Sequence, residues 1–295
     1  MTAKHHTLRV ALCAVLLGWL TSGVFADEDE GKMTEGIEQQ WLKTIVSVEQ
    51  IPEKGDPIAI GTAFLVGTKN QHVLLVTAKH VIANETGQLR PNLGYRFNLK
   101  SDKAALFPES DMLKHAPANW FLSATHDVAC RFIAFPLDSD ILTIPTEMFL
   151  PTTRTQPGAP ALVPGFPLGL RSPEHANPIV RRGIVARVDS SNFILDAFVY
   201  PGNSGSPILY VPTIQVSGGL KSPFINRVRL IGLVSNTISY IDVAVSQHTQ
   251  RPRVTFEENS GLCNIVPADA ILDLINRKEV RDIDALPDLK PKESK

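Results

Sequence analysis

The sequence predicts an all-β protein that ends in a single helix. Most of the chain consists of short runs rich in Val, Ile and Phe, each bounded by Gly, Pro, Asn or Asp, which is the pattern of β-strands. These runs follow one another without helical segments between them, as in sandwiches and barrels. The composition, with 43% hydrophobic and 20% charged residues among 295, excludes disorder over most of the length.

The expected strands begin after residue 40 and continue almost to the helix. Each is an apolar run that turn-forming residues separate from the next one, and no internal repeat relates one run to another. In chain order the expected strands are 44–48, 58–66, 72–77, 95–99, 128–135, 161–164, 179–188, 193–198, 208–211 and 228–236.

One stretch near the C-terminal end has the periodicity of a helix. Its apolar residues Ile271, Leu272, Leu274 and Ile275 fall on one face. Pro267 suits the start of such a helix, and two basic residues at 277 and 278 suit its end. We therefore expect one C-terminal helix.

The N-terminus has the organisation of a secretory signal peptide. Lys4 and Arg9 give a positive start, an apolar run covers 10–20, and small residues lead to Ala26. The alternative is a membrane anchor, but a spanning helix needs about 20 apolar residues and this run is shorter. The sequence thus predicts a signal peptide at 1–26, cleaved after Ala26. The protein would be secreted or periplasmic, without stable membrane insertion after cleavage.

The remainder divides by composition into three parts. Residues 27–40 are acidic with few apolar side chains, and we expect a flexible leader there. Residues 41–276 hold all the expected strands and the helix, and so form one domain. Residues 277–295 are charged and contain Pro, which predicts a flexible tail.

Charge and cysteine usage limit the partners and cofactors. The formal net charge of −1 argues against nucleic acid as a partner, because phosphate binding needs a basic excess. Cys130 and Cys263 follow the expected cleavage site. They could form a disulfide or act as two buried small hydrophobes, and the sequence leaves both readings open. No metal-ligand spacing is present, so no metal and no cofactor is predicted.

Three short motifs carry the residue types of nucleophilic catalysis. His80 closes one apolar run, Asp127 opens another, and Ser204 lies within Pro-Gly-Asn-Ser-Gly-Ser-Pro at 201–207. A serine hydroxyl needs a neighbouring imidazole to take its proton, and that imidazole needs a carboxylate to fix its tautomer. A Gly-rich turn can direct several backbone N–H groups at the oxyanion that forms. The three motifs together predict a serine hydrolase.

The order and content of these motifs resemble the chymotrypsin-like serine proteases, and most of all their bacterial HtrA (DegP-like) branch. The resemblance covers most of residues 41–276. It implies a trypsin-like protease domain of two antiparallel six-stranded β-barrels with the site between them. The matching segments are 61–66, 77–81, 127–129, 165–169, 182–185, 196–207, 231–236 and 261–267.

The resemblance assigns a role to each site residue. It makes Ser204 the nucleophile, His80 the general base and acid, and Asp127 the orienting carboxylate. The N–H groups of Gly202 and Ser204 would form the oxyanion hole, and Ser235 would pair with substrate and support Asp127. The specificity pocket would be lined by that strand and by Phe198, Val199 and Tyr200, which implies a preference for apolar residues before the cleaved bond.

Two departures from the family pattern limit the comparison. Asn203 stands where activated zymogens carry an Asp that pairs with a new N-terminus, so that route of activation is not expected. The residues after Asn276 are too few for the peptide-binding PDZ domain of typical HtrA proteins.

The function expected from these features is a secreted serine endopeptidase that acts on proteins or peptides. Two alternatives of other classes stay open. One is a catalytically inactive binding module that keeps the protease fold. The other is a serine esterase, although the order of Asp and Ser is reversed from that of the α/β-hydrolases. The oligomeric state is not predicted.

Overall fold

The computed structural model describes residues 39–113, 120–172, 174–189, 193–212 and 228–286. They belong to one compact unit, Ile37–Lys295. The expected signal peptide at 1–26 and most of the expected leader at 27–40 lie outside the described residues and stay predictions. No helix in the described ranges is long and apolar enough to cross a membrane.

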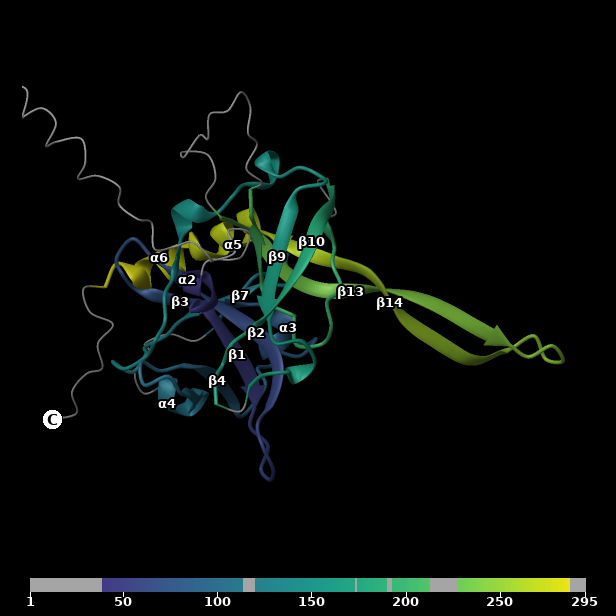
Figure 1. The fold of residues 1–295 in the computed structure, drawn as a ribbon, viewed down its shortest axis with the longest axis horizontal. Coiled ribbons are helices and arrows are strands. Elements are labelled where there is room, and N and C mark those ends of the chain that lie inside the picture. Colours follow the sequence, from purple (N-terminus) through teal and green to yellow (C-terminus); the bar gives the residue numbers. More distant parts are fainter. Residues whose placement is uncertain (1–38, 114–119, 173, 190–192, 213–227, 287–295) are drawn as a thin grey trace, which may run out of the picture. The chain divides into compact units, whose positions relative to one another are not determined.

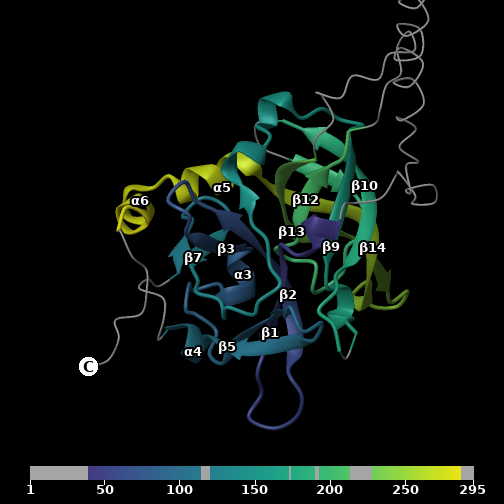
Figure 2. The same ribbon diagram turned by 60° about the vertical axis from the view of Figure 1, so that its left-hand side comes forward.

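The first half of the chain forms one mainly antiparallel sheet (Figures 1 and 2). Within the described residues, seven strands follow the order β5-β4-β1-β2-β3-β7-β6, and β8 pairs with β2 in parallel. The sequence predicts a six-stranded barrel here, whereas this eight-stranded sheet is open and two of its strands have only two residues. The strands are β1 Ile45–Gln50, β2 Ile58–Gly67, β3 Val73–Thr77, β4 Leu93–Asn98, β5 Ala104–Pro108, β6 Phe121–Leu122, β7 Ala129–Phe132 and β8 Ile144–Pro145.

The second half forms a closed barrel of six strands, as predicted. The order around it is β10-β11-β14-β13-β12-β9. Figure 2 shows this barrel beside the first sheet. Its strands are β9 Pro160–Gly165, β10 Ile179–Val188, β11 Phe193–Asp196, β12 Pro207–Tyr210, β13 Arg229–Val245 and β14 Pro252–Pro267.

The two sheets enclose separate cores. The first core lies under β1, β2 and β3 and includes residues of the predicted C-terminal helix. The second core fills the barrel. Cys130 belongs to the first core and Cys263 to the second, and both are free and buried. The two cysteines therefore act as small hydrophobes, and the disulfide reading is wrong.

Short helices lie between the strands, and two of them follow the last strand. The predicted C-terminal helix is confirmed as α5, and its apolar face packs Ile271 and Leu274 into the first core. Leu272 is only partly buried. The α-helices are α2 Gln39–Leu42, α3 Lys79–Ile82, α4 Glu109–Leu113, α5 Ala268–Ile275 and α6 Lys278–Asp284; 3-10 turns are η1 Thr146–Met148, η2 Thr152–Arg154 and η3 Pro167–Gly169.

Helix α6 stands where the sequence predicts the start of a flexible tail. Its Val280 is buried, and its Asp284 accepts hydrogen bonds from Thr68 Oγ1 at 2.6 Å and Asn70 Nδ2 at 3.0 Å. His72 Nδ1 lies 3.0 Å from the same carboxylate. Asp284 thus finds its partners on the β2–β3 turn, which composition alone does not reveal.

The hairpin of β13 and β14 extends well beyond the barrel (Figure 1). The sequence predicts a strand only at 228–236 and none at 252–267. The outer part of this hairpin, residues 237–259, is called the arm below. Its side chains are exposed on both faces, so the alternation of apolar and polar residues that marks a half-buried strand is missing.

Candidate active site

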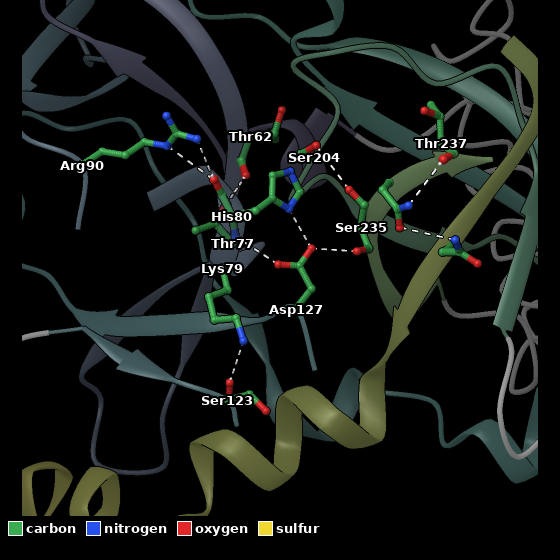
Figure 3. A network of polar contacts seen from close by, with 12 residues as sticks. Thr62, Thr77, Lys79, His80, Arg90, Ser123, Asp127, Ser204, Ser235 and Thr237 are labelled. Carbon is green, nitrogen blue, oxygen red and sulfur yellow. Dashed lines mark hydrogen bonds and ion pairs between the residues drawn. The ribbon is translucent and has the colours of Figure 1, made fainter. Parts of the chain in front are cut away.

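The predicted catalytic residues come from both halves of the fold and meet at one place. His80 lies in α3, directly after β3, and Asp127 lies in the loop before β7. Ser204 occupies the turn before β12, and Ser235 lies in β13. Figure 3 shows the imidazole of His80 between Asp127 and Ser204.

Asp127 is held by three donors. His80 Nδ1 lies 2.7 Å from Asp127 Oδ2, and the His80 backbone N–H donates to Oδ1 at 3.0 Å. The Ser235 hydroxyl donates to Oδ2 at 2.7 Å. Beside an ionised carboxylate, this arrangement places a proton on Nδ1 of His80 and leaves Nε2 able to accept one.

Asp127 stays ionised because its hydrogen bonds outweigh its burial. Burial raises the pKa of this carboxyl, but the hydrogen bonds from His80 and Ser235 lower it further than burial raises it. The net result is a pKa below 3.8, the ordinary value. At neutral pH the carboxylate can therefore stabilise a protonated His80.

The Ser204 hydroxyl does not bond to His80 in this structure. It donates to the backbone carbonyl of Ser235 at 3.3 Å. Both side chains nevertheless line the same pocket. A rotation about χ1 of Ser204 would redirect the hydroxyl, and catalytic hydrogen bonds are often formed only in the substrate complex.

Two glycines make the sharp turn around Ser204 possible. Gly202 has φ +98° and Gly205 has φ +83°, the left-handed region that favours glycine. A Cβ on Gly202 would lie 2.2 Å from the carbonyl oxygen of Phe166, and one on Gly205 would lie 2.1 Å from that of Thr62. Neither position can hold a side chain without moving the turn.

Thr62 of β2 fastens this turn to the first sheet, a role that the sequence analysis missed. Its backbone N–H donates to the Ser204 carbonyl at 2.9 Å, and its hydroxyl donates to the Gly202 carbonyl at 2.7 Å. The same hydroxyl accepts the N–H of Phe166 at 3.1 Å. A threonine inside an apolar strand is the available signal, because a buried hydroxyl needs partners.

The predicted oxyanion donors have free N–H groups. The carbonyl of Pro201 accepts the N–H of Leu168 at 2.6 Å, so the trans peptide turns the N–H of Gly202 to the opposite side. Within the described residues, no hydrogen bond uses the N–H of Gly202 or of Ser204. Leu168 belongs to η3 and has φ +56°. The sequence analysis did not predict its contact with Pro201.

A pocket of about 270 Å³ opens beside Ser204. Val199 and Tyr200 line it, as the sequence predicts, together with Ser235 and Thr237. Phe198 does not: it is 56% exposed and packs toward Gly261. After β11, it is the side chain of Val199, not that of Phe198, that is buried in the second core.

Residues 61–218 match the family model of the trypsin-like peptidase domain. The matched segment contains His80, Asp127 and Ser204. The chain belongs to the trypsin-like peptidase family. No curated protein matches the sequence.

Solved structures resemble this trypsin-like peptidase at low identity. An HtrA-type protease, AlgW with a tripeptide, has 14% identity and a TM-score of 0.44; the match covers 80% of this chain and 60% of that one. The thermostable serine protease AL20 has 15% identity and a TM-score of 0.49, with coverages of 80% and 96%. Human heparin binding protein has 12% identity and a TM-score of 0.47, with coverages of 81% and 92%.

Asn203, next to Ser204, forms its hydrogen bonds within its own turn. It is fully buried, and its Oδ1 accepts the N–H of Tyr200 at 3.1 Å. Its Nδ2 donates to Ser206 Oγ at 3.5 Å. In this peptidase the amide thus holds the turn through local hydrogen bonds, and a neutral amide has no charge to pair with an N-terminal ammonium.

Ser235→Ala is expected to lower kcat/KM for a peptide substrate by about tenfold, because one charge-assisted hydrogen bond to Asp127 is lost. The folded pKa of Asp127 should rise toward its ordinary value. The stability that ionised Asp127 contributes is present above the unfolded pKa and lost as pH falls through the folded pKa, so acid unfolding should begin at higher pH in the variant.

The measurement is thermal unfolding from pH 2 to 7, together with kcat/KM near neutral pH. Ser235→Thr keeps the hydroxyl and serves as the matched control. Equal acid stability of Ser235→Ala and the wild type would contradict the role of this hydroxyl.

Proposed function

We propose that the protein is a secreted or periplasmic serine endopeptidase that cleaves proteins or peptides through His80, Asp127 and Ser204. The observation that carries this proposal is the arrangement around Ser204: an oriented imidazole on one side and two unused backbone N–H groups on the other. An inactive homologue needs neither feature. The substrates would be peptide chains, and no cofactor takes part.

The proposed reaction has two stages, formation of an acyl-enzyme and its hydrolysis. The Ser204 oxygen attacks the peptide carbonyl carbon while Nε2 of His80 takes the hydroxyl proton. The N–H groups of Gly202 and Ser204 meet the charge that develops on the carbonyl oxygen. The C–N bond breaks and His80 gives its proton to the leaving amine. Water, deprotonated by His80, then hydrolyses the acyl-enzyme and restores the Ser204 hydroxyl.

One contact favours the second candidate, an inactive binding module. The Ser204 hydroxyl is directed to the Ser235 carbonyl, away from His80. A fluorophosphonate reagent distinguishes the two, because it reacts only with an activated serine. We expect covalent labelling at Ser204, detected by peptide mass spectrometry, followed by cleavage of casein. Labelling without cleavage of casein, but with hydrolysis of simple esters, would favour an esterase instead.

We also expect a preference for Val, Ala or Leu before the cleaved bond. None of the described residues that line the pocket beside Ser204 is acidic, and an unpaired substrate cation would lose its hydration there. The guanidinium of Arg181 lies 4.9 Å from the ring centroid of Tyr200, which lines the pocket, and it would repel a second cation. Asp242, which could have supplied a charge, is exposed on the arm.

This preference is measured by the cleavage rates of a peptide library in which the residue before the cleaved bond is varied. A dominant Arg or Lys would contradict it. Asp242→Asn serves as the control variant and should leave the profile unchanged.

A further inference from the structure

The arm is a two-stranded ribbon that contacts the barrel at its base, where Asn259 Nδ2 donates to the Val199 carbonyl at 2.7 Å. β13 pairs with β12 only at 229–233, and β14 pairs with β11 only at 262–264. Farther out, among the described residues, each strand pairs only with the other (Figure 1). Both faces and both outer edges of the arm are therefore open to solvent.

Large apolar side chains gather on this ribbon. An isolated two-stranded hairpin is at best marginally stable in water, and exposed apolar patches mark interaction surfaces. The arm lies far from the apolar cores that would otherwise cover such residues. The exposed ones are Tyr240 at 59%, Ile241 at 61%, Val243 at 40%, Val245 at 52%, Val254 at 51% and Phe256 at 51%.

The register separates these residues onto two faces. Ile241 pairs with Glu257 and Val243 pairs with Thr255, so these four side chains share a face. The bond from Ser239 Oγ to Glu257 Oε1, at 2.6 Å, agrees with that assignment. Toward the tip the register shifts between Ala244 and Val245, so that Val245 pairs with Pro252 and Arg253 is the extra residue of a bulge. Alternation along each strand places Val245 and Arg253 on the same face as Val243 and Thr255. We call this face the aliphatic face; its members are Ile241, Val243, Val245, Arg253, Thr255 and Glu257.

The aliphatic face is complementary to itself. Along β14, Glu257 lies two residues from Thr255 toward the barrel, and Arg253 lies two residues from Thr255 toward the tip of the arm. A two-fold axis through Val243 and Thr255 would therefore bring Glu257 against the partner's Arg253, and the reverse. Ile241 would meet the partner's Val245 in the same way. A self-complementary patch of this kind is what a symmetric dimer uses.

We propose that the arm joins two copies of this chain by antiparallel stacking of their aliphatic faces. The opposite face is a poorer candidate, because it pairs Tyr240 with Glu258 and Asp242 with Phe256 and its two acids have no base among the paired residues there. An anionic membrane is also disfavoured, since Glu257 would be repelled by it. Three aliphatic side chains per copy make a small interface, so we expect a dissociation constant in the micromolar range, about 1–100 μM.

Charge reversal tests the pairing directly in the full chain, with Ser204→Ala present to prevent self-digestion. Sedimentation velocity from about 1 to 200 μM should show a monomer–dimer equilibrium for this parent. Arg253→Glu and Glu257→Arg should each weaken dimerisation at least about tenfold, because like charges then meet twice across the axis. The double variant should recover the parent dimer.

A mixture of the two single variants gives the sharpest result. Each carries one sign of charge at both positions, so the two should fail to dimerise alone and form a heterodimer together. Residues 253 and 257 are too far apart along one strand to rescue each other within a chain. Glu258→Arg makes the same charge change on the opposite face and should dimerise like the parent.

Three results would overturn the proposal. One is a monomer throughout the concentration range, with or without added lipid vesicles. Another is an oligomer that neither single variant weakens. The third is a dimer that Glu258→Arg weakens as much as Glu257→Arg, which would place the interface elsewhere on the arm.

Discussion

Ser204→Ala is expected to lower kcat for peptide hydrolysis by about 10⁴-fold or more, while the fold stays intact. The methyl group cannot form the acyl-enzyme, so the covalent route is lost. The change should leave the turn in place, because backbone groups hold it: the Ser204 carbonyl accepts the N–H of Thr62, and the Gly205 N–H donates to the Val234 carbonyl. The measurement is turnover of a peptide substrate under saturating conditions, with circular dichroism to confirm folding.

Ser206→Ala is the matched control for this change. Ser206 lies two residues along the same turn, is buried, and touches Asn203 through its hydroxyl at 3.5 Å. Ser206→Ala should keep kcat within a few-fold of the wild-type value. If Ser204→Ala turned over substrate at the wild-type rate, Ser204 would not be the nucleophile.

Asp127→Asn is expected to cost about 10⁴-fold in kcat, as the corresponding change does in a protease with this triad. Three donors converge on the carboxylate: two from His80 and one from Ser235. An amide offers one oxygen acceptor, and its NH₂ group would face His80 Nδ1 as a donor. The imidazole would then carry its proton on Nε2, where it cannot accept the proton of Ser204.

The comparison for this variant is Asp242→Asn, which removes an exposed acid from the arm and should leave kcat unchanged. A neutral-pH rate for Asp127→Asn within a few-fold of the parent would mean that another group orients His80. The rate of Ser235→Ala should lie between those of Asp127→Asn and Asp242→Asn, because this variant removes one donor to Asp127 and keeps the charge of the carboxylate.

Local patterns predicted the strands that form continuous apolar runs and the helix with one apolar face. β2 and β10 lie almost where their apolar runs predict them, although most of β10 is exposed, and α5 follows its apolar face. The outer half of β13 and the start of β14 were missed because both faces are exposed, so no periodic signal exists. The helix α6 was missed because its contacts with the rest of the fold, such as that of Asp284 with Thr68, join segments far apart in sequence.

The candidate site divides in the same way. The family resemblance named His80, Asp127 and Ser204. In the structure His80 and Ser204 line one pocket, and Asp127 contacts His80 Nδ1. Thr62 and Leu168, which support the serine turn, were not named. The buried hydroxyl of Thr62 marks that residue as needing a partner, but the sequence does not show that the partner is Gly202, and the contact of Leu168 with Pro201 also joins distant segments. Phe198 was misplaced because sequence position does not reveal which way the chain turns after a strand.

The two buried thiols have a consequence for how the chain can be made. Burial raises the pKa of Cys130 and of Cys263 to about 12, so neither is a thiolate at physiological pH. Because the thiolate is the species that oxidants and disulfide exchange attack, both side chains are chemically inert in the folded state. The described fold therefore needs neither an oxidising compartment nor a disulfide isomerase, and it should form equally well in a reducing cytosol and in a periplasm.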